Sequence, residues 1–441
     1  MDIFATLTGG AYTLVFFIIA LSIIVFVHEY GHYIVGRWTG IHAEVFSLGF
    51  GPVLWSRQDR RGTRWQVAAV PFGGYVKFLG DADASSVRNT DLSGYSVQER
   101  RHTMAGAPLW ARAATVVAGP LFNFVLTFVL LGGLLLATGI PQQQPTVGKL
   151  LATPFAGPSL EPGDVILALN GGATPDLEAF RDVAGKLPAV PAIDYTLLRG
   201  GDEIVVKGPH PYPAIVATVL IRSAAIDAGL QTGDVILKAA GQDITVFSQL
   251  PEIVTAGKGA PVALTVWRDG KTFELTLTPR IRTMPDEDGT FVEKYQIGLG
   301  SGLVFEPATR RSGLWETVSL TAVQMWDMTT ATFSGLKHII AGQISSCNLS
   351  GAIGMAETMG DAARNGLESF IGMMAVLSLG VGILNLFPVP VLDGGHLVFH
   401  AYEAVVRRPP SDRALRVMMS VGLALIVSLM LFALSRDITC V

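Results

Sequence analysis

The chain has 441 residues, of which 50% are hydrophobic and 15% are charged, and its formal net charge at pH 7 is −4. Soluble domains usually carry about 25% charged residues, so this composition predicts an integral membrane protein with soluble parts. The small net charge gives no reason to expect nucleic acid as a partner. The only cysteines are Cys347 and Cys440, which excludes a disulfide framework and a multi-cysteine zinc site.

The first predicted element is an uncharged segment over residues 11–27, rich in Phe, Ile, Leu and Val. With the turns of helix that follow, it reaches the length of about 20 residues that spans a bilayer. Residues 1–36 contain no Lys or Arg, whereas a secretory signal peptide needs a basic start. We therefore expect this segment to be retained as the first transmembrane helix.

Three ionisable side chains, His28, Glu29 and His32, lie at the end of this span. The two histidines are four residues apart, so on a helix they share one face, which is the spacing of a zinc site whose carboxylate acts as a general base. Neutral imidazoles bind Zn²⁺, the metal lowers the pKa of water, and the carboxylate takes the proton as water attacks a carbonyl. The alternative is a helix end whose polar side chains merely reach the lipid headgroups.

Residues 37–112 carry an excess of basic residues. Because the N-terminus has none, the positive-inside rule places this segment and the histidine cluster towards the cytoplasm. Short strands are expected over residues 43–54, 63–70 and 75–79. These hairpins could dip into the bilayer beside a cavity and receive an extended substrate at a sheet edge, or form a small cytoplasmic sheet that only packs on the helices.

The second span is predicted within residues 113–144, where no charged residue occurs and residues 121–140 are nearly continuous Leu, Phe and Val. It returns the chain to the outside. Asn123 lies near its cytoplasmic start, and an amide within a lipid-spanning segment usually faces protein. Asn123 could therefore support the metal site or pack against another helix.

Residues 145–213 and 214–283 repeat one pattern, in which residues 159–167 match residues 229–237 seventy positions later. In both copies a later strand ends in Arg before a glycine-containing turn. Two copies of one small domain are inferred. The pattern resembles the PDZ domain, a class that binds extended chain ends by strand addition. The pair could instead act as a size filter or spacer.

Residues 284–366 are expected to contain a polar connector, with its centre at residues 298–302, and an amphipathic helix over residues 314–344. Trp315 and Trp326 suit this helix to a membrane interface. Its charged residues exclude it from the predicted spans.

The third span is predicted over residues 369–392, within a segment of residues 367–400. Pro388 and Pro390 break its end, and broken backbone at membrane depth is tolerated only where it lines a cavity. Residues 401–441 supply a second basic loop and a fourth span, which leaves the C-terminus outside.

A catalytic zinc site needs a third protein ligand besides His28 and His32. The first and third spans both run towards the cytoplasm, so Asp393 is expected at the depth of the two histidines. His396 and His400 are competing ligands further along the chain. Asp393 could also serve only as a helix cap or as a partner for a nearby arginine.

In this order the motifs resemble the site-2 protease family of intramembrane zinc metalloproteases, in its bacterial form with tandem PDZ domains. The motifs are His28-Glu29-x-x-His32, Gly119-Pro120-x-x-Asn123, the two repeats and Leu392-Asp393-Gly394. The resemblance implies one zinc ion held by His28, His32 and Asp393, with Glu29 activating water.

The resemblance also implies substrate contacts near Asn385 and a substrate strand presented by the hairpin at Gly49, Phe50 and Gly51. Asn123, Pro388 and Pro390 are expected to support the site. Family members often carry an Asn where this chain has Gly380-Val381-Gly382, a departure that affects the implied substrate contacts. They also often have Gly-Pro at Gly351-Ala352, which affects only a local turn.

The implied function is the second cut of a single-span membrane protein, typically an anti-sigma factor already trimmed outside the bacterial inner membrane. The termini and PDZ-like domains would lie on the periplasmic face. The alternative is a non-catalytic receptor or chaperone whose repeats capture chain ends around a structural metal; such a site needs no adjacent base, so Glu29 discriminates the two. A metal transporter is disfavoured because no further carboxylates line a membrane path.

The expected fold is therefore an integral membrane, mainly α-helical protein with four transmembrane helices, a membrane-associated β-hairpin region and two PDZ-like α+β domains. Its predicted segments are residues 1–36, 37–112, 113–144, 145–213, 214–283, 284–366, 367–400 and 401–441.

Overall fold

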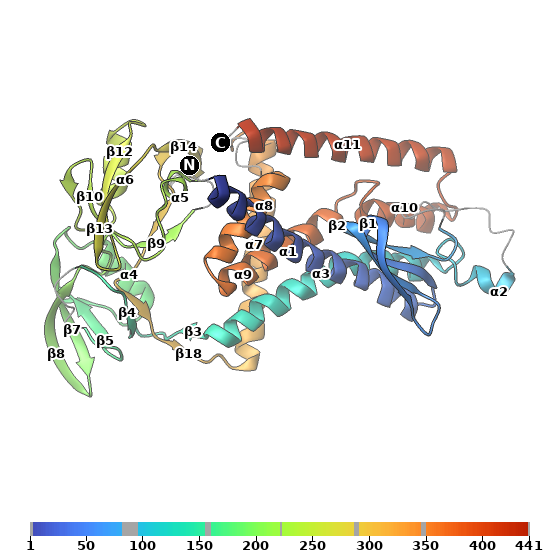
Figure 1. Ribbon diagram of the computed structural model, residues 1–441. Helices are drawn as coiled ribbons and strands as arrows, with labels where there is room; N and C mark the ends of the chain where they lie inside the picture. Colours follow the sequence, from blue (N-terminus) through green and yellow to red (C-terminus); the bar gives the residue numbers. More distant parts are fainter. Residues whose placement is uncertain are drawn as a thin grey trace. The chain divides into compact units, whose positions relative to one another are not determined.

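The computed structural model describes residues 3–81, 96–154, 160–220, 223–285, 291–344 and 350–439, and it is shown in Figure 1. Cys347 and Cys440 lie outside these residues. The chain divides into two compact units, which are described separately. Unit 1 comprises Met1–Leu134, Val318–Ser334 and Leu349–Val441, and unit 2 comprises Leu135–Thr317 and Gly335–Asn348.

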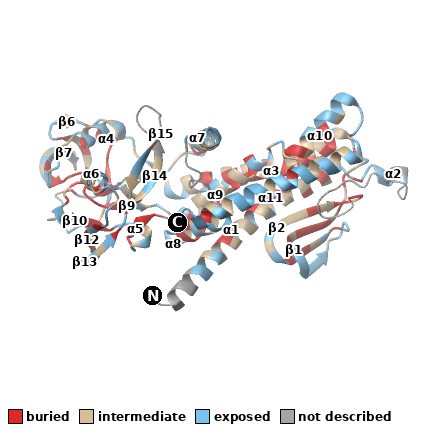
Figure 2. Cartoon of the chain, turned by 90° about the horizontal axis from the view of Figure 1, so that it is seen from above, coloured by how far each residue is buried: buried red, intermediate tan, exposed pale blue. Residues whose placement is uncertain are grey.

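Within the described residues, four helices are long and apolar enough to cross a membrane. They belong to α1 (Ile3–Trp38), α3 (Leu109–Thr138), α9 (Leu367–Asn385) and α11 (Asp412–Thr439). Each of the four predicted spans coincides with one of them, so the prediction of four membrane helices is confirmed. Most apolar side chains of α11 are exposed, as Figure 2 shows, which suits a helix surrounded by lipid.

The third span is shorter than predicted, because α9 ends at Asn385 rather than at residue 392. A loop with Pro388 and Pro390 follows, since proline cannot continue the helical hydrogen bonds. The chain then enters α10 (Asp393–Val406). A Cβ at Gly394 would lie 2.3 Å from the carbonyl oxygens of Leu386 and Phe387, so only glycine allows this loop to fold onto α10.

The region after α1 forms one sheet from two long bent strands, β1 (Ala43–Gln58) and β2 (Arg64–Phe78). Residues 45–48 of β1 pair with residues 64–67 and also with residues 74–77 of β2. The second of these β2 segments therefore lies at an edge of the sheet.

The separate strands expected over residues 63–70 and 75–79 are thus two halves of one strand, and the strand expected over residues 43–54 extends to Gln58. Glycines in the middle of each strand bend the backbone instead of ending it; Gly49 and Gly73 both have positive φ. This bending was read from the sequence as strand breaks.

The sheet packs on the membrane helices through a small apolar core. Phe46, Val76 and Phe78 of the sheet are buried together with Tyr33 of α1 and Ala111 of α3. Burial of each Phe or Val side chain contributes roughly 1.5–3 kcal/mol. The core therefore fixes β2 against the end of α1 that carries the histidines.

Helix α8 (Ala352–Arg364) was not predicted. Its buried Met359 packs with Phe17 and Ile24 of α1 and Phe370 of α9. At its start, the backbone N–H groups of residues 351, 353 and 354 donate to the carboxylate of Asp437. A carboxylate at this position satisfies donors that the helix cannot pair internally and is favoured by the helix dipole.

Two further helices lie outside this core. The predicted amphipathic helix is α7 (Leu314–Ile340), which ends a few residues earlier than expected. Near the N-terminal side of α3, the four residues of α2 (Val97–Arg100) form a single turn that a Ser96 capping box opens.

Unit 2 contains two copies of one arrangement. In the first copy a four-stranded sheet has the order β6-β5-β7-β8, and in the second the equivalent order is β11-β10-β12-β13. One helix, α4 or α6, belongs to each copy. The strands of the first copy are β5 (Val165–Leu169), β6 (Gly172–Ala173), β7 (Ala192–Arg199) and β8 (Asp202–Pro209), with α4 (Leu177–Gly185). Those of the second are β10 (Val235–Ala239), β11 (Gln242–Asp243), β12 (Val262–Arg268) and β13 (Lys271–Leu277), with α6 (Gln249–Ala256).

The expected connector takes part in both copies. Near its centre, β16 (Leu299–Ser301) pairs with β9 (Val216–Val219), and β17 (Phe305–Pro307) pairs with β4 (Val147–Leu150). The interpretation of residues 298–302 as a connector was therefore wrong. It failed because these strands return from far along the chain and lie outside the repeated pattern. The remaining elements are β3 (Ile140–Pro141) with β18 (Thr309–Arg310), β14 (Arg280–Pro285) with β15 (Phe291–Gln296), and α5 (Ala224–Asp227).

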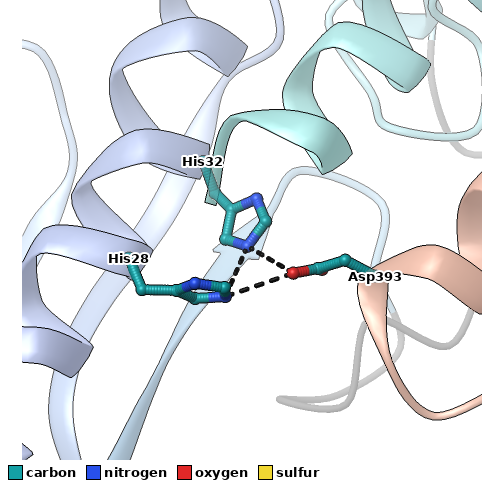
Figure 3. Close-up of side chains that lie close together, drawn as sticks. All are labelled: His28, His32 and Asp393. Atoms are coloured by element: carbon teal, nitrogen blue, oxygen red, sulfur yellow. Dashed lines mark hydrogen bonds and ion pairs between the residues drawn. The ribbon is translucent and has the colours of Figure 1, made fainter. Parts of the chain in front are cut away.

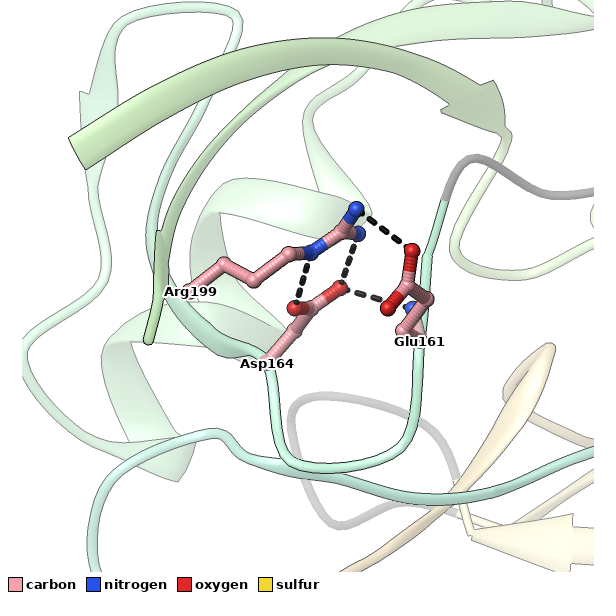
Figure 4. A network of polar contacts seen from close by, with 3 residues as sticks. All are labelled: Glu161, Asp164 and Arg199. Atoms are coloured by element: carbon pink, nitrogen blue, oxygen red, sulfur yellow. Dashed lines mark hydrogen bonds and ion pairs between the residues drawn. The ribbon is translucent and has the colours of Figure 1, made fainter. Parts of the chain in front are cut away.

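The repeated Gly-Asp and Arg residues form the same ion pair in both copies. In the first, Arg199 donates two hydrogen bonds of 2.7 Å to the buried carboxylate of Asp164 and a third to Glu161 (Figure 4). In the second, Arg268 donates two to Asp234. Burial alone would raise the pKa of Asp164, but the Arg199 guanidinium and the Glu161 backbone N–H hold that pKa below its ordinary value.

Candidate metal centre

Three potential metal ligands meet where α1 faces the first turn of α10 (Figure 3). His28 and His32 lie one turn apart on α1, and Asp393 is the first residue of α10. The Nε2 atoms of the histidines are 3.2 Å apart. Oδ2 of Asp393 lies 3.2 Å from Nε2 of His28 and 3.5 Å from Nε2 of His32.

These separations fit a zinc ion. In a tetrahedral site with bonds of about 2.0–2.2 Å, neighbouring ligand atoms lie about 3.4 Å apart. The side chains of His28, His32 and Asp393 are only 11%, 12% and 17% exposed, so few water molecules can compete for them. Two imidazoles and one carboxylate also form a donor set that suits Zn²⁺ and leaves a fourth position open.

The far side of each imidazole ring is held by α3. Nδ1 of His32 donates to the carbonyl oxygen of Thr115 at 2.8 Å, which leaves Nε2 as the ligand atom. Nδ2 of the Asn123 side-chain amide lies 3.1 Å from Nδ1 of His28, and the amide is fully buried. A metal on Nε2 requires Nδ1 of His28 to donate, so in the metal-bound state the amide is turned to present its oxygen there.

Gly119 of α3 lies directly against the two imidazole rings. A Cβ at this position would be 2.2 Å from Nε2 of His32 and 2.9 Å from Cε1 of His28. Both distances are shorter than any tolerable contact, so even alanine would displace the ligands. A steric clash therefore explains why glycine occupies the first position of the Gly119-Pro120 motif. The motif in the sequence did not reveal this clash.

Glu29 points towards the edge of the sheet. Its carboxylate lies near the backbone N–H of Val76 in β2. Gly74 lies beside it, and a Cβ there would be 3.2 Å from Cγ of Glu29. The carboxylate thus stands between the metal ligands and the β2 edge. The sequence indicated Glu29, but Gly74 and Val76 were missed because nothing local marks them.

The other predicted site residues do not belong to the three-ligand group. Asn385 is the half-buried last residue of α9 and makes no side-chain hydrogen bond within the described residues. Gly49, Phe50 and Gly51 lie in the bend of β1, where Phe50 is exposed and stacks on Tyr75.

The remaining candidates lie in or after the loop between α9 and α10. Pro388 and Pro390 shape this loop. Pro390 packs closely on Gly422 of α11, where a Cβ would lie 3.0 Å from the proline ring. His396 and His400 lie on α10 outside the three-ligand group.

A buried ion pair joins α3 to α10. Arg112 is 5% exposed and donates to both carboxylate oxygens of Glu403, and its Nε donates to the carbonyl oxygen of Ala107. The pair ties the helix that carries Asp393 to the helix that orients His28 and His32. Sequence reasoning assigned Arg112 only to the basic excess. The pair could have been suspected from the sequence, because Arg112 and Glu403 have opposite charges and each lies near one end of an apolar segment.

Comparison with known proteins gives a family for this architecture. The family model described as "Peptidase family M50" matches residues 16–429. A protein named as a zinc metalloprotease from Agrobacterium fabrum is 34% identical over 432 residues, covering 96% of this chain and 94% of the relative. The regulator of sigma-E protease of Salmonella typhimurium is 32% identical over 452 residues, covering 96% and 97%. Among solved structures, the PDZ domain of the SdrC-like protein from Listeria monocytogenes is 19% identical, covering 20% of this chain and 84% of that domain, with a TM-score of 0.16.

Proposed function

The chain belongs to peptidase family M50 and is an intramembrane zinc metalloprotease, and we propose that it cuts a single-span membrane protein within or near its transmembrane segment. The predicted resemblance to the site-2 proteases and the prediction of an enzyme are thereby confirmed. The alternative of a non-catalytic receptor or chaperone is left without support.

The observation that carries the proposal is the grouping of His28, His32 and Asp393 around one point, with Glu29 on the same helix as two of them. We assign the three ligands to one zinc ion per chain. When bound, Zn²⁺ supplies Lewis-acid chemistry, polarising a carbonyl and acidifying water. Glu29 is the general base: its carboxylate accepts a proton from the attacking water and returns it to the leaving nitrogen.

The substrate reaches the site as an extended strand. A spanning helix satisfies its own backbone hydrogen bonds, so it must unwind before a peptide bond is exposed. The edge segment at residues 74–77 of β2 can pair with the unwound chain by strand addition, and Glu29 stands beside it. This edge, more than the bend at Gly49 to Gly51, is positioned to present the scissile bond. Exposed Leu54 and Trp55 of the hairpin suit contact with lipid.

We further assign the two repeats of unit 2 to PDZ-like domains on the periplasmic face of the bacterial inner membrane, with both termini. The metal centre then lies towards the cytoplasm, as the distribution of basic residues indicates. One relative is named as a regulator of sigma-E protease. An anti-sigma factor already trimmed outside the membrane is therefore the proposed substrate. The repeats would bind its new chain end or exclude untrimmed proteins.

The proposal is tested by co-expressing a tagged, trimmed anti-sigma factor with the wild-type chain or its Glu29→Gln variant. We expect cleavage by the wild type and a loss of at least 100-fold in the variant, since removal of a general base costs about 10²–10⁴-fold. A Glu368→Gln variant, changed at an exposed carboxylate in the first turn of α9, serves as the control. Full cleavage by Glu29→Gln would refute the assignment.

A further inference from the structure

A second candidate site lies at the end of α1, beyond the metal ligands. A hollow of about 250 Å³ opens there, between the last turn of α1 and the start of the sheet. The residues that line it include two arginines, two histidines and one tyrosine: Arg37, Arg61, His42, His102 and Tyr33. Nothing in the proposed proteolytic reaction uses this hollow.

The carboxylate of Asp59, which is close to the hollow, already accepts hydrogen bonds from other groups. Asp59 accepts hydrogen bonds from the hydroxyl of Tyr33, from Nε1 of Trp65 and from the backbone N–H groups of Arg61 and Thr63. Its four acceptor positions are therefore filled by groups other than a guanidinium.

The two arginines keep donors available for a ligand. Arg37 donates one hydrogen bond of 2.9 Å to the hydroxyl of Tyr33 and stacks over that ring. The guanidinium of Arg61 makes no ion pair or hydrogen bond within the described part of the chain. Neither arginine is paired with a carboxylate there. Because a guanidinium presents five N–H donors in a planar fork, the pair can grip a tetrahedral oxyanion.

The location limits what this oxyanion can be. The membrane-spanning part of α1 ends at Trp38, whose exposed indole suits the level of the lipid headgroups. The hollow is smaller than the 300–1,000 Å³ that is usual for pockets binding drug-sized ligands. Its volume suits a phosphate group better than a whole nucleotide. At this level the phosphate groups in greatest supply belong to phospholipids.

We propose that this hollow binds a phosphate group, supplied by the headgroup of an anionic phospholipid. Arg37 and Arg61 would donate to its oxygens in charge-assisted hydrogen bonds, with His42 and His102 beside them. The lipid would hold the end of α1 to the start of β1, within two turns of His32. This inference goes beyond the proteolytic function and does not depend on it.

The test is native mass spectrometry of the full-length protein, titrated in uncharged detergent with phosphatidylglycerol or with diacylglycerol of the same acyl chains. We expect retained phosphatidylglycerol, little diacylglycerol, and at least tenfold weaker phosphatidylglycerol binding in the double variant Arg37→Gln/Arg61→Gln. Arg57→Gln/Arg60→Gln is the matched control, because these exposed arginines of the same hairpin do not line the hollow. It should bind as the wild type does.

A third titration, with inorganic phosphate, distinguishes the two sources. If the protein binds inorganic phosphate but not the lipid, and the Arg37→Gln/Arg61→Gln variant loses this binding, the hollow is a phosphate site. Its ligand is then free phosphate and not a phospholipid. Equal lipid binding by that variant, or equal retention of diacylglycerol, would overturn the proposal. If the double variant melts earlier than the wild type in lipid-free micelles, lipid binding is measured instead with the single variant Arg61→Gln, whose side chain is exposed.

Discussion

At the scale of the residue, the metal centre depends on positions that carry no functional group. Gly119 is the sharpest case, because its missing side chain leaves the space that the imidazoles of His28 and His32 fill. The motif around it was visible in the sequence. The steric reason was not visible, because it depends on a contact between two helices. The contacting residues, His32 and Gly119, are 87 positions apart in the chain.

Replacement of Gly119 by alanine should therefore reduce the rate of cleavage by about 100-fold, the cost of misplacing catalytic groups by about 1 Å. Single-turnover cleavage of a transmembrane substrate measures this, together with the zinc content of the purified variant. Gly133→Ala is the matched control on the same helix, because a Cβ there meets nothing within 4 Å. Equal rates for the two variants would show that the site has more room than these contacts imply.

At the scale of the element, α10 is held in place by the Arg112–Glu403 pair. Replacing Glu403 by Gln leaves the Arg112 charge buried without its partner, which costs about 3–5 kcal/mol. We expect a lower melting temperature and slower cleavage. The double variant Arg112→Gln/Glu403→Gln should lose less than the sum of the single variants in a double-mutant cycle. Additive losses would mean that the two side chains stabilise the fold independently.

In unit 2, the Asp164–Arg199 pair predicts a dependence of stability on pH. The pKa of Asp164 is lowered by folding, so its contribution is present above the unfolded value of about 4 and is lost as the pH falls through the folded value. We expect the melting temperature to drop as the pH falls below about 4. The Asp164→Asn variant should melt earlier at pH 7 and lack this part of the drop, whereas Asp182→Asn at an exposed position of α4 should behave as the wild type. If the melting temperature of Asp164→Asn fell with pH as steeply as that of the wild type, the pH dependence would come from other carboxylates.

At the scale of the whole molecule, the sequence allowed prediction of what is local and periodic. The four membrane helices were found because an apolar run of sufficient length has few alternatives to a span. The repeats of unit 2 were found because Asp164 and Asp234 stand in the same short pattern. Asp393 was linked to His28 and His32 through the direction of the helices, and the structure brings all three together.

What could not be predicted depends on contacts between distant segments. Helix α8 was missed because it has only 13 residues and few large apolar side chains. The strands of the connector were missed because β16 and β17 gain stability only when β9 and β4 are already placed. The same holds for Arg112 and Glu403, whose relation is visible only once α3 and α10 lie together.

The measurement that tests the central claim most directly is metal analysis of the purified protein and three variants. We expect one zinc ion per chain in the wild type, in Glu29→Gln and in the control His396→Ala, which changes a histidine of α10 outside the ligand group. Asp393→Ala should retain almost none, because two imidazoles alone bind zinc weakly. Unchanged zinc in Asp393→Ala, or its loss in His396→Ala, would contradict the assigned metal centre.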